Sequence, residues 1–144
     1  MTVAAILKHK GHEVASARPT DTIAEVTRQL TTRGIGAVVV RDAADQLLGI
    51  VSERDIVHAL AAHGAHALEM TAAQVMTRSL NTATPQTTVG EAMAIMTVSR
   101  FRHLPVIEHD RLVGLVSIGD VVKARIGEQD TEVDTLRAYV SGGA

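Results

Sequence analysis

The sequence lacks cysteine and tryptophan, and it has one phenylalanine and one tyrosine among its 144 residues. The absence of cysteine excludes disulfides, thiolate zinc sites, iron–sulfur clusters and thiol nucleophiles. The scarcity of aromatic side chains removes the stacking platforms that proteins use to bind single-stranded nucleic acid. A formal net charge of −2 likewise gives no electrostatic reason to expect nucleic acid or an anionic membrane as a partner.

Long apolar runs are also lacking. The stretch before Lys8 is too short for the core of a signal peptide or for a membrane span, so we expect a soluble, cytoplasmic protein with no membrane partner. Apolar residues still make up 46% of the chain, and with so few aromatics the core must consist of aliphatic side chains and Met. The length suits one compact domain or two small ones that share a core.

An internal repeat is the most informative pattern in the sequence. The matching blocks are 17–30 with 83–96, 34–40 with 100–106, and 47–57 with 112–122. Pro19 aligns with Pro85, and the offset between the halves shortens by one residue in a turn before the third block. Because the parts follow in the same order twice, each half is expected to be one supersecondary unit.

Each half predicts the element order βαββα. A Thr-x-x-Glu capping box marks the start of the first helix, two short apolar runs then indicate a buried hairpin, and a second helix follows the hairpin. Gly34 is expected to end the first helix of the first half. The predicted helix starts are Thr22, Ser52, Thr88 and Ser117, and short first strands are expected near 14–17 and 80–83.

We therefore predict an α/β (α+β) fold of two tandem βαββα repeats, packed sheet to sheet as one pseudo-two-fold module, since a single repeat buries too little surface to be stable alone. The expected boundaries are 1–66 for the first repeat with an N-terminal helix and 67–127 for the second. An additional amphipathic helix and tail are expected over 128–144, because Val133, Leu136 and Val140 recur at helical spacing.

A junction of the form Gly-apolar-apolar-Ser-x-x-Asp occurs in both halves, ending in Ser52 and Asp55 in the first and in Ser117 and Asp120 in the second. A Ser hydroxyl at a helix N-terminus suits a phosphate, and the Asp one turn later suits a ribose diol. The alternative is a plain capping box that needs no ligand. We expect the short Asp side chain to reach its own cap less well than Glu, which favours the ligand.

The two junctions and the strand Arg102-His-Leu-Pro-Val106 resemble the cystathionine-β-synthase (CBS) domain family, over nearly the whole chain. The resemblance implies a two-repeat regulatory module with two clefts for adenine nucleotides, such as AMP, ADP, ATP, NAD or S-adenosylmethionine. It implies energy or redox-state sensing that signals by conformational change. A homodimer is expected as well, because the predicted outer helices over 56–60, 121–126 and 133–140 expose more apolar surface than a monomer should. An unidentified regulated protein is the other expected partner.

Carried over by resemblance, the middle strand of one repeat completes the cleft of the other. The first cleft would then contain Ile50, Ser52, Arg54, Asp55, Arg102, His103 and Pro105. The second would contain Gly36, Ala37, Leu115, Ser117, Gly119 and Asp120. The first cleft would carry the extra positive charge, so it should prefer ligands with more phosphate.

Nothing in the sequence indicates catalysis: it has no nucleophile elbow, zinc-protease helix or Walker loop, so we predict no enzyme and no catalytic residue. His58, His63 and His66 do not share one helix face and are interpreted as exposed histidines without a metal. One rival stays open. The chain could be an interaction module that binds no ligand, dimerises, and docks on a partner enzyme or transporter.

Overall fold

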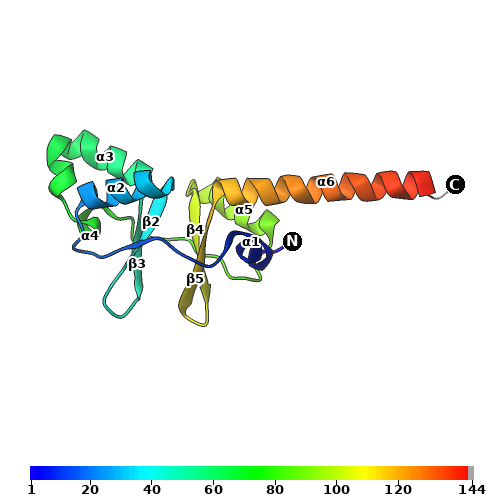
Figure 1. Cartoon of the computed structure of the whole chain (residues 1–144), viewed down its shortest axis with the longest axis horizontal. Helices are drawn as coiled ribbons and strands as arrows, with labels where there is room; N and C mark the ends of the chain where they lie inside the picture. Colours follow the sequence, from blue (N-terminus) through cyan, green and yellow to red (C-terminus); the bar gives the residue numbers. More distant parts are fainter. Residues whose placement is uncertain (143–144) are drawn as a thin grey trace. The chain divides into compact units, whose positions relative to one another are not determined.

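The computed structural model describes residues 1–142 and divides into two compact units (Figure 1). The first-repeat unit consists of Glu13–Leu80, and the second-repeat unit consists of Met1–His12 together with Asn81–Ala144. Each unit has its own aliphatic core. Residues 143 and 144, part of the predicted tail, lie outside the described residues.

The first-repeat unit contains β1 (Ser16–Ala17), α2 (Ile23–Arg33), β2 (Ala37–Arg41), β3 (Leu47–Ser52) and α3 (Glu53–His63). A short 3₁₀ helix (Gly64–Glu69) and α4 (Ala72–Val75) follow. The three strands form one sheet in the order β1-β2-β3, with β1 parallel to β2 and β3 antiparallel to β2. The predicted βαββα order is confirmed in this unit.

The second-repeat unit contains α1 (Val3–Lys10), α5 (Val89–Ser99), β4 (His103–Glu108), β5 (Arg111–Ser117) and α6 (Ile118–Gly142). Strands β4 and β5 form an antiparallel hairpin. In place of the predicted first strand, the structure has an isolated parallel bridge between Ala83 and Val106. The mixed α/β class is confirmed in both units.

The predicted helix caps hold, with one exception. Thr22 and Glu25 form a complete reciprocal capping box, and Gly34 ends α2 in the left-handed conformation, with φ of 63°. At the start of α5, Thr88 Oγ1 accepts from Glu91 N at 3.0 Å. Within residues 1–142 the reciprocal half of this second box is not formed. The helix begins as predicted, with one capping hydrogen bond in place of two.

The N-terminal helix belongs to a different unit from the one expected. Val3 N donates to Thr87 O at 2.8 Å, and Val89 N donates to Met1 O at 3.0 Å, so α1 packs with the second repeat. Helix α4, which precedes the second repeat, makes the equivalent contacts with the first repeat. Each repeat therefore packs with the segment that precedes the other repeat in the sequence. In the first repeat, Ala72 N donates to Asp21 O at 2.7 Å, and Ile23 N donates to Met70 O at 2.8 Å.

Helix α6 also differs from the expectation. It continues without a break from Ile118 to Gly142, whereas the sequence suggested one helix ending near Gly127 and a separate one beyond it. A glycine in a helix interior costs only about 1 kcal/mol relative to alanine, and no proline follows to stop the helix. From Gln129 to Val140 every residue of α6 is exposed.

Candidate ligand site at the strand-to-helix junctions

The first junction is a closed network of hydrogen bonds at the start of α3. Ser52 is the last residue of β3 and the N-cap of α3, and its Oγ accepts from Asp55 N at 3.3 Å. Asp55 Oδ2 accepts from Ser52 N at 2.8 Å and from Ser52 Oγ at 2.9 Å. The other carboxylate oxygen, Oδ1, accepts from Thr77 Oγ1 at 2.7 Å. Both oxygens of Asp55 therefore have neutral donors from the protein.

Thr77 reaches Asp55 because the chain after α4 lies directly against β3. Ile50 and Thr77 form an antiparallel bridge, with N to O distances of 3.0 and 2.8 Å. A Cβ at Gly49 would lie 2.6 Å from Thr77 O and 2.8 Å from Met76 Sδ. The glycine of the junction pattern is thus required for the close approach of this segment.

The second junction has the same capping hydrogen bonds, but a different side chain contacts its carboxylate. Asp120 Oδ2 accepts from Ser117 N at 2.8 Å, and Asp120 N donates to Ser117 Oγ at 3.1 Å. Lys10 Nζ, at the end of α1, donates to Asp120 Oδ2 at 2.6 Å and to Leu115 O at 2.9 Å. A Cβ at Gly114 would lie 2.6 Å from Leu7 Cδ2, so this glycine allows α1 to approach β5.

Lys10 also changes the protonation chemistry of the second junction. Partial burial by itself raises the pKa of the Asp120 carboxyl. The hydrogen bonds from Lys10 and Ser117 and the positive charge of Lys10 outweigh that effect, and they hold the pKa of Asp120 below its ordinary value. Asp120 is therefore an ionised, partly neutralised acceptor near neutral pH.

The duplicated unit and its junctions match one protein family along most of the chain. The CBS domain matches residues 5–62 and again residues 72–127. The chain belongs to the CBS-domain family. Its two CBS repeats account for the two copies of βαββα and for both Ser-x-x-Asp junctions.

Known CBS proteins resemble the chain in sequence and in fold. A mitochondrial CBS domain-containing protein of Arabidopsis thaliana is 35% identical over 99% of this chain and 73% of its own length. A CBS-domain-containing protein of Agrobacterium tumefaciens has 44% identity and a TM-score of 0.84, over 86% of this chain and 92% of that one. A CBS domain pair solved with 5′-methylthioadenosine and S-adenosyl-L-methionine has 26% identity and a TM-score of 0.78, over 89% and 98%.

The remaining predicted site residues lie beside the junction of their own CBS repeat. In the first repeat, Ala37 pairs with Ser52 across the sheet, and Gly36 O accepts from Glu53 N at 3.0 Å. In the second repeat, His103 pairs with Ser117, and Arg102 O accepts from Ile118 N at 2.8 Å. The predicted crossing of these residues into the cleft of the other repeat stays a prediction.

The other predicted residues divide into buried and exposed positions. Ile50 is buried in β3, and Pro105 is buried opposite the half-buried Leu115 in the β4–β5 ladder. Arg54 and Gly119 are exposed in the first turns of α3 and α6. The exposed pair is therefore accessible to a ligand at the helix N-termini, whereas Ile50 and Pro105 are buried and belong to neither of the two core clusters.

The capping geometry contradicts one expectation from the sequence. Asp reaches its own cap at least as well as Glu does, since the carboxylate-to-cap distance is 2.8 Å at Ser52 and 3.3 Å at Thr22. The capping role of the Asp is therefore fully met without a ligand. In addition, the second junction has its own cation in Lys10, which the sequence comparison of the junctions did not reveal.

Thr77 and Lys10 were missed because they lie outside the junction pattern. The signal that could have identified them is the pattern Thr-x-Ala, which occurs as Thr2-Val-Ala before the first repeat and as Thr71-Ala-Ala before the second. Both segments end close to the glycine of a junction. A repeated segment that precedes each unit indicates a shared docking role.

A shallow depression of about 440 Å³ lies between α2 and α3 of the first-repeat unit. Gly36, Glu53 and Val57 contribute to its lining, and Ser52 and Asp55 do not. The depression therefore borders the junction at Gly36 and Glu53, and the capped carboxylate of Asp55 does not line it.

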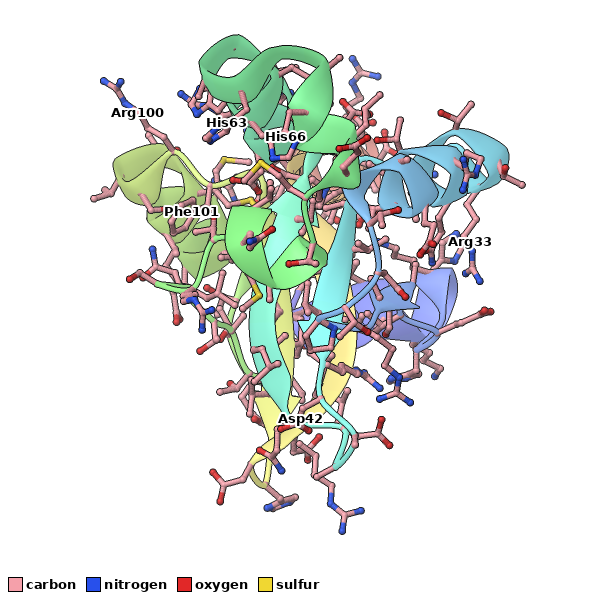
Figure 2. The ribbon with its side chains drawn as sticks, turned by 90° about the vertical axis from the view of Figure 1, so that its left-hand side faces the viewer. Arg33, Asp42, His63, His66, Arg100 and Phe101 are labelled. Atoms are coloured by element: carbon pink, nitrogen blue, oxygen red, sulfur yellow. The ribbon has the colours of Figure 1, made fainter. Side chains whose placement is uncertain are left out.

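Two of the histidines singled out in the sequence lie near the end of α3. Figure 2 shows His63 and His66 at the end of α3 and in the turn that follows it, while Asp42 lies at the opposite end of β2 and β3. His66 Nδ1 lies 3.3 Å from Glu69 Oε2. Residues 1–142 contain no cluster of three His, Cys, Asp or Glu side chains placed to hold a metal ion, and no helix long and apolar enough to cross a membrane.

Proposed function

We propose that this chain is a regulatory module that binds an adenosyl ligand at its strand-to-helix junctions without consuming it. The observation that carries the proposal is the duplicated junction, in which a Ser hydroxyl, an Asp carboxylate and the first turn of a helix converge in each CBS repeat. The similar CBS pair solved with two adenosyl compounds supports this ligand class. AMP, ADP, ATP, NAD and S-adenosylmethionine are the candidate ligands, and none of them acts as a catalytic cofactor.

The junctions retain the capacity to bind a ribose diol despite their internal hydrogen bonds. A carboxylate has about four lone-pair positions. Asp55 accepts from three donors and Asp120 accepts from two, both on Oδ2. A ligand hydroxyl can therefore donate to Asp120 Oδ1 directly. At Asp55 a diol would share the carboxylate with Thr77 or displace its hydroxyl.

Calorimetry and thermal shift with the five candidate ligands, guanine nucleotides and adenosine test the proposal. Asp55→Ala and Asp120→Ala should each weaken binding at one class of site by roughly tenfold to a hundredfold, the loss expected when a charged acceptor is removed. Glu25→Ala, which removes the equivalent capping carboxylate of α2, is the matched control and should leave binding unchanged. Absence of heat at millimolar ligand would contradict ligand binding, and protein-dependent loss of the nucleotide would contradict the regulatory role.

One observation favours the rival function. Because both capping boxes are complete without a ligand, the Ser and Asp residues can be explained by helix stability alone. In that case the chain is an interaction module that docks on a partner enzyme or transporter. The same calorimetry decides between them, since the rival predicts no adenosyl binding by a folded, dimeric protein.

We further propose that the protein is a homodimer. Exposed apolar side chains are concentrated on α3 and α6, at Val57, Leu60, Val122 and Ile126 and again near the end of α6. Apolar surface concentrated in this way usually marks an interface. Light scattering at tens of micromolar, with and without nucleotide, should give twice the mass of the 15.3 kDa chain. The cytoplasmic location expected from the sequence stays a prediction, because one relative is mitochondrial.

A further inference from the structure

Helix α6 is exposed at every residue from Gln129 to Val140. Figure 1 shows α6 extending well past α1 and α5 of the second-repeat unit. Val133, Leu136 and Val140 are 44%, 64% and 76% exposed. An isolated helix of this length is marginal in water, so the segment needs a partner for its apolar side in order to be stable. We propose that residues 126–140 of α6 form a parallel two-stranded coiled coil with the same segment of a second copy of this chain.

The spacing of the apolar side chains indicates a coiled coil. Ile126, Val133 and Val140 lie seven residues apart, and Gln129 and Leu136 lie three residues after the first two of them. These are the a and d positions of successive heptads. β-Branched residues at a with leucine at d favour two parallel strands. Ile126, the two valines and Leu136 therefore favour two parallel chains, with Gln129 as the polar residue of the stripe.

The charged residues that flank this stripe also favour the parallel arrangement. In a parallel pair each g residue faces the e residue that follows it by five positions on the partner. Glu132 then faces Arg137 of the second copy, and Arg125 faces Asp130, so both kinds of contact are attractive. Arg125 already donates to Glu128 at 3.0 Å, so the contact between Glu132 and Arg137 carries most of the preference.

An antiparallel pair uses these charges less well. Residues at e then face e, and residues at g face g. When Val133 packs opposite Leu136, Asp130 faces Arg137, but Arg125 and Glu132 find no opposite charge. When Ile126 packs opposite Leu136, Asp130 faces Asp130 and Glu132 faces Glu132. The parallel, in-register pair is the arrangement that satisfies all four flanking charges.

This inference rests on the homodimer part of the proposed function and assigns residues 126–140 to the dimer surface. It does not depend on nucleotide binding, because the junction residues lie outside 126–140.

The chain has no cysteine, so a single introduced thiol reports unambiguously on which residues face each other. Gln129→Cys and Leu136→Cys should both form a disulfide-linked dimer under mild oxidation, since in a parallel coiled coil the same residue of both chains lies within disulfide reach. Ala138→Cys, on the outer f position, is the matched control and should stay monomeric on a denaturing gel.

A second pair of variants separates the coiled coil from any other dimer contact. Leu136→Glu should raise the dimer dissociation constant at least roughly a hundredfold, because two buried leucines are lost per dimer, whereas Ala138→Glu should have little effect. Glu132→Arg and Arg137→Glu should each weaken the homodimer, and an equal mixture of the two variants should form a heterodimer more tightly than either variant alone.

Three outcomes are distinguishable. Disulfides at both core positions and a monomeric Leu136→Glu variant support the parallel coiled coil. A dimer that persists in Leu136→Glu with no disulfide at position 129 overturns the coiled coil and leaves the homodimer intact. A wild-type protein that sediments as a monomer overturns both.

Discussion

Replacing Lys10 with methionine removes one charge from the second junction and keeps the length of the side chain. The ion pair with Asp120 has a distance of 2.6 Å, and the side chains are 40% and 24% exposed. Solvent screens a pair with this exposure, and such pairs typically contribute up to about 1 kcal/mol. We therefore expect Lys10→Met to lower the free energy of unfolding at pH 7 by about 0.5–1 kcal/mol, which is a fall in Tm of roughly 2–4 °C for a chain of this size.

The stability difference between Lys10→Met and wild type should depend on pH. The pKa of Asp120 is lowered in the folded protein, so its ionised form stabilises the fold at pH values above the ordinary pKa of an aspartate. This contribution is lost as the pH falls through the folded pKa. The difference in stability between Lys10→Met and wild type should therefore be present at pH 6–7 and shrink below about pH 4.

Urea unfolding followed by circular dichroism, repeated from pH 7 to pH 3, measures this difference. Lys8→Met is the matched control, because Lys8 is an exposed lysine on the same helix. Equal stability of Lys10→Met and wild type at pH 7, or a difference that does not change with pH, would show that the ion pair does not stabilise the fold.

Three further changes test other parts of the junctions. Gly49→Ala should destabilise the protein more than Gly114→Ala, because the added methyl meets a backbone carbonyl in the first case and a movable leucine side chain in the second. Thermal unfolding of both variants measures the difference. Thr77→Val should cost about 1 kcal/mol of stability without ligand, and it should leave AMP affinity equal or higher if the ribose takes the place of that hydroxyl. Arg102→Ala should weaken ATP more than adenosine at the Asp55 junction if the middle strand of one repeat completes the cleft of the other, and calorimetry at low and high salt checks this.

The features predicted correctly are those that local physics determines. Capping residues, a left-handed glycine and short apolar runs act over a few residues, which is why the starts of α2, α3, α5 and α6 and both hairpins follow from the sequence. The docking of α1 could not be predicted in this way. Its hydrogen bonds join Val3 to Thr87 and Met1 to Val89, and no local pattern indicates a partner so distant in the chain.

In the candidate site too, the local pattern could be predicted from the sequence and the long-range contacts could not. The duplicated Ser-x-x-Asp pattern located both helix starts and both carboxylates correctly. The pattern could not reveal that Asp55 is paired with Thr77 and Asp120 with Lys10, since those donors arrive on segments that precede the opposite repeat. The difference between the two junctions therefore depends on the docked segments and is invisible in the junction motif itself.

The position of Lys10 suggests a way for a ligand at the second junction to affect the first repeat. Lys10 ends α1, and the chain then passes through Gly11, with φ of 105°, into Glu13 of the first-repeat unit. A ribose hydroxyl that donates to Asp120 Oδ1 would share the carboxylate charge with Lys10 and so weaken one of the contacts that hold the end of α1, while the hydrogen bonds at Val3 and Ala4 would hold its start. We therefore expect bound nucleotide to increase amide hydrogen exchange at the last turn of α1 and to leave exchange at its first turn unchanged.

The Lys10→Met variant should show that faster exchange without nucleotide, and little further change when nucleotide is added. Protection of the last turn by nucleotide in the wild-type protein would contradict this coupling, since it would mean that the ligand strengthens the attachment of α1 instead of competing with it.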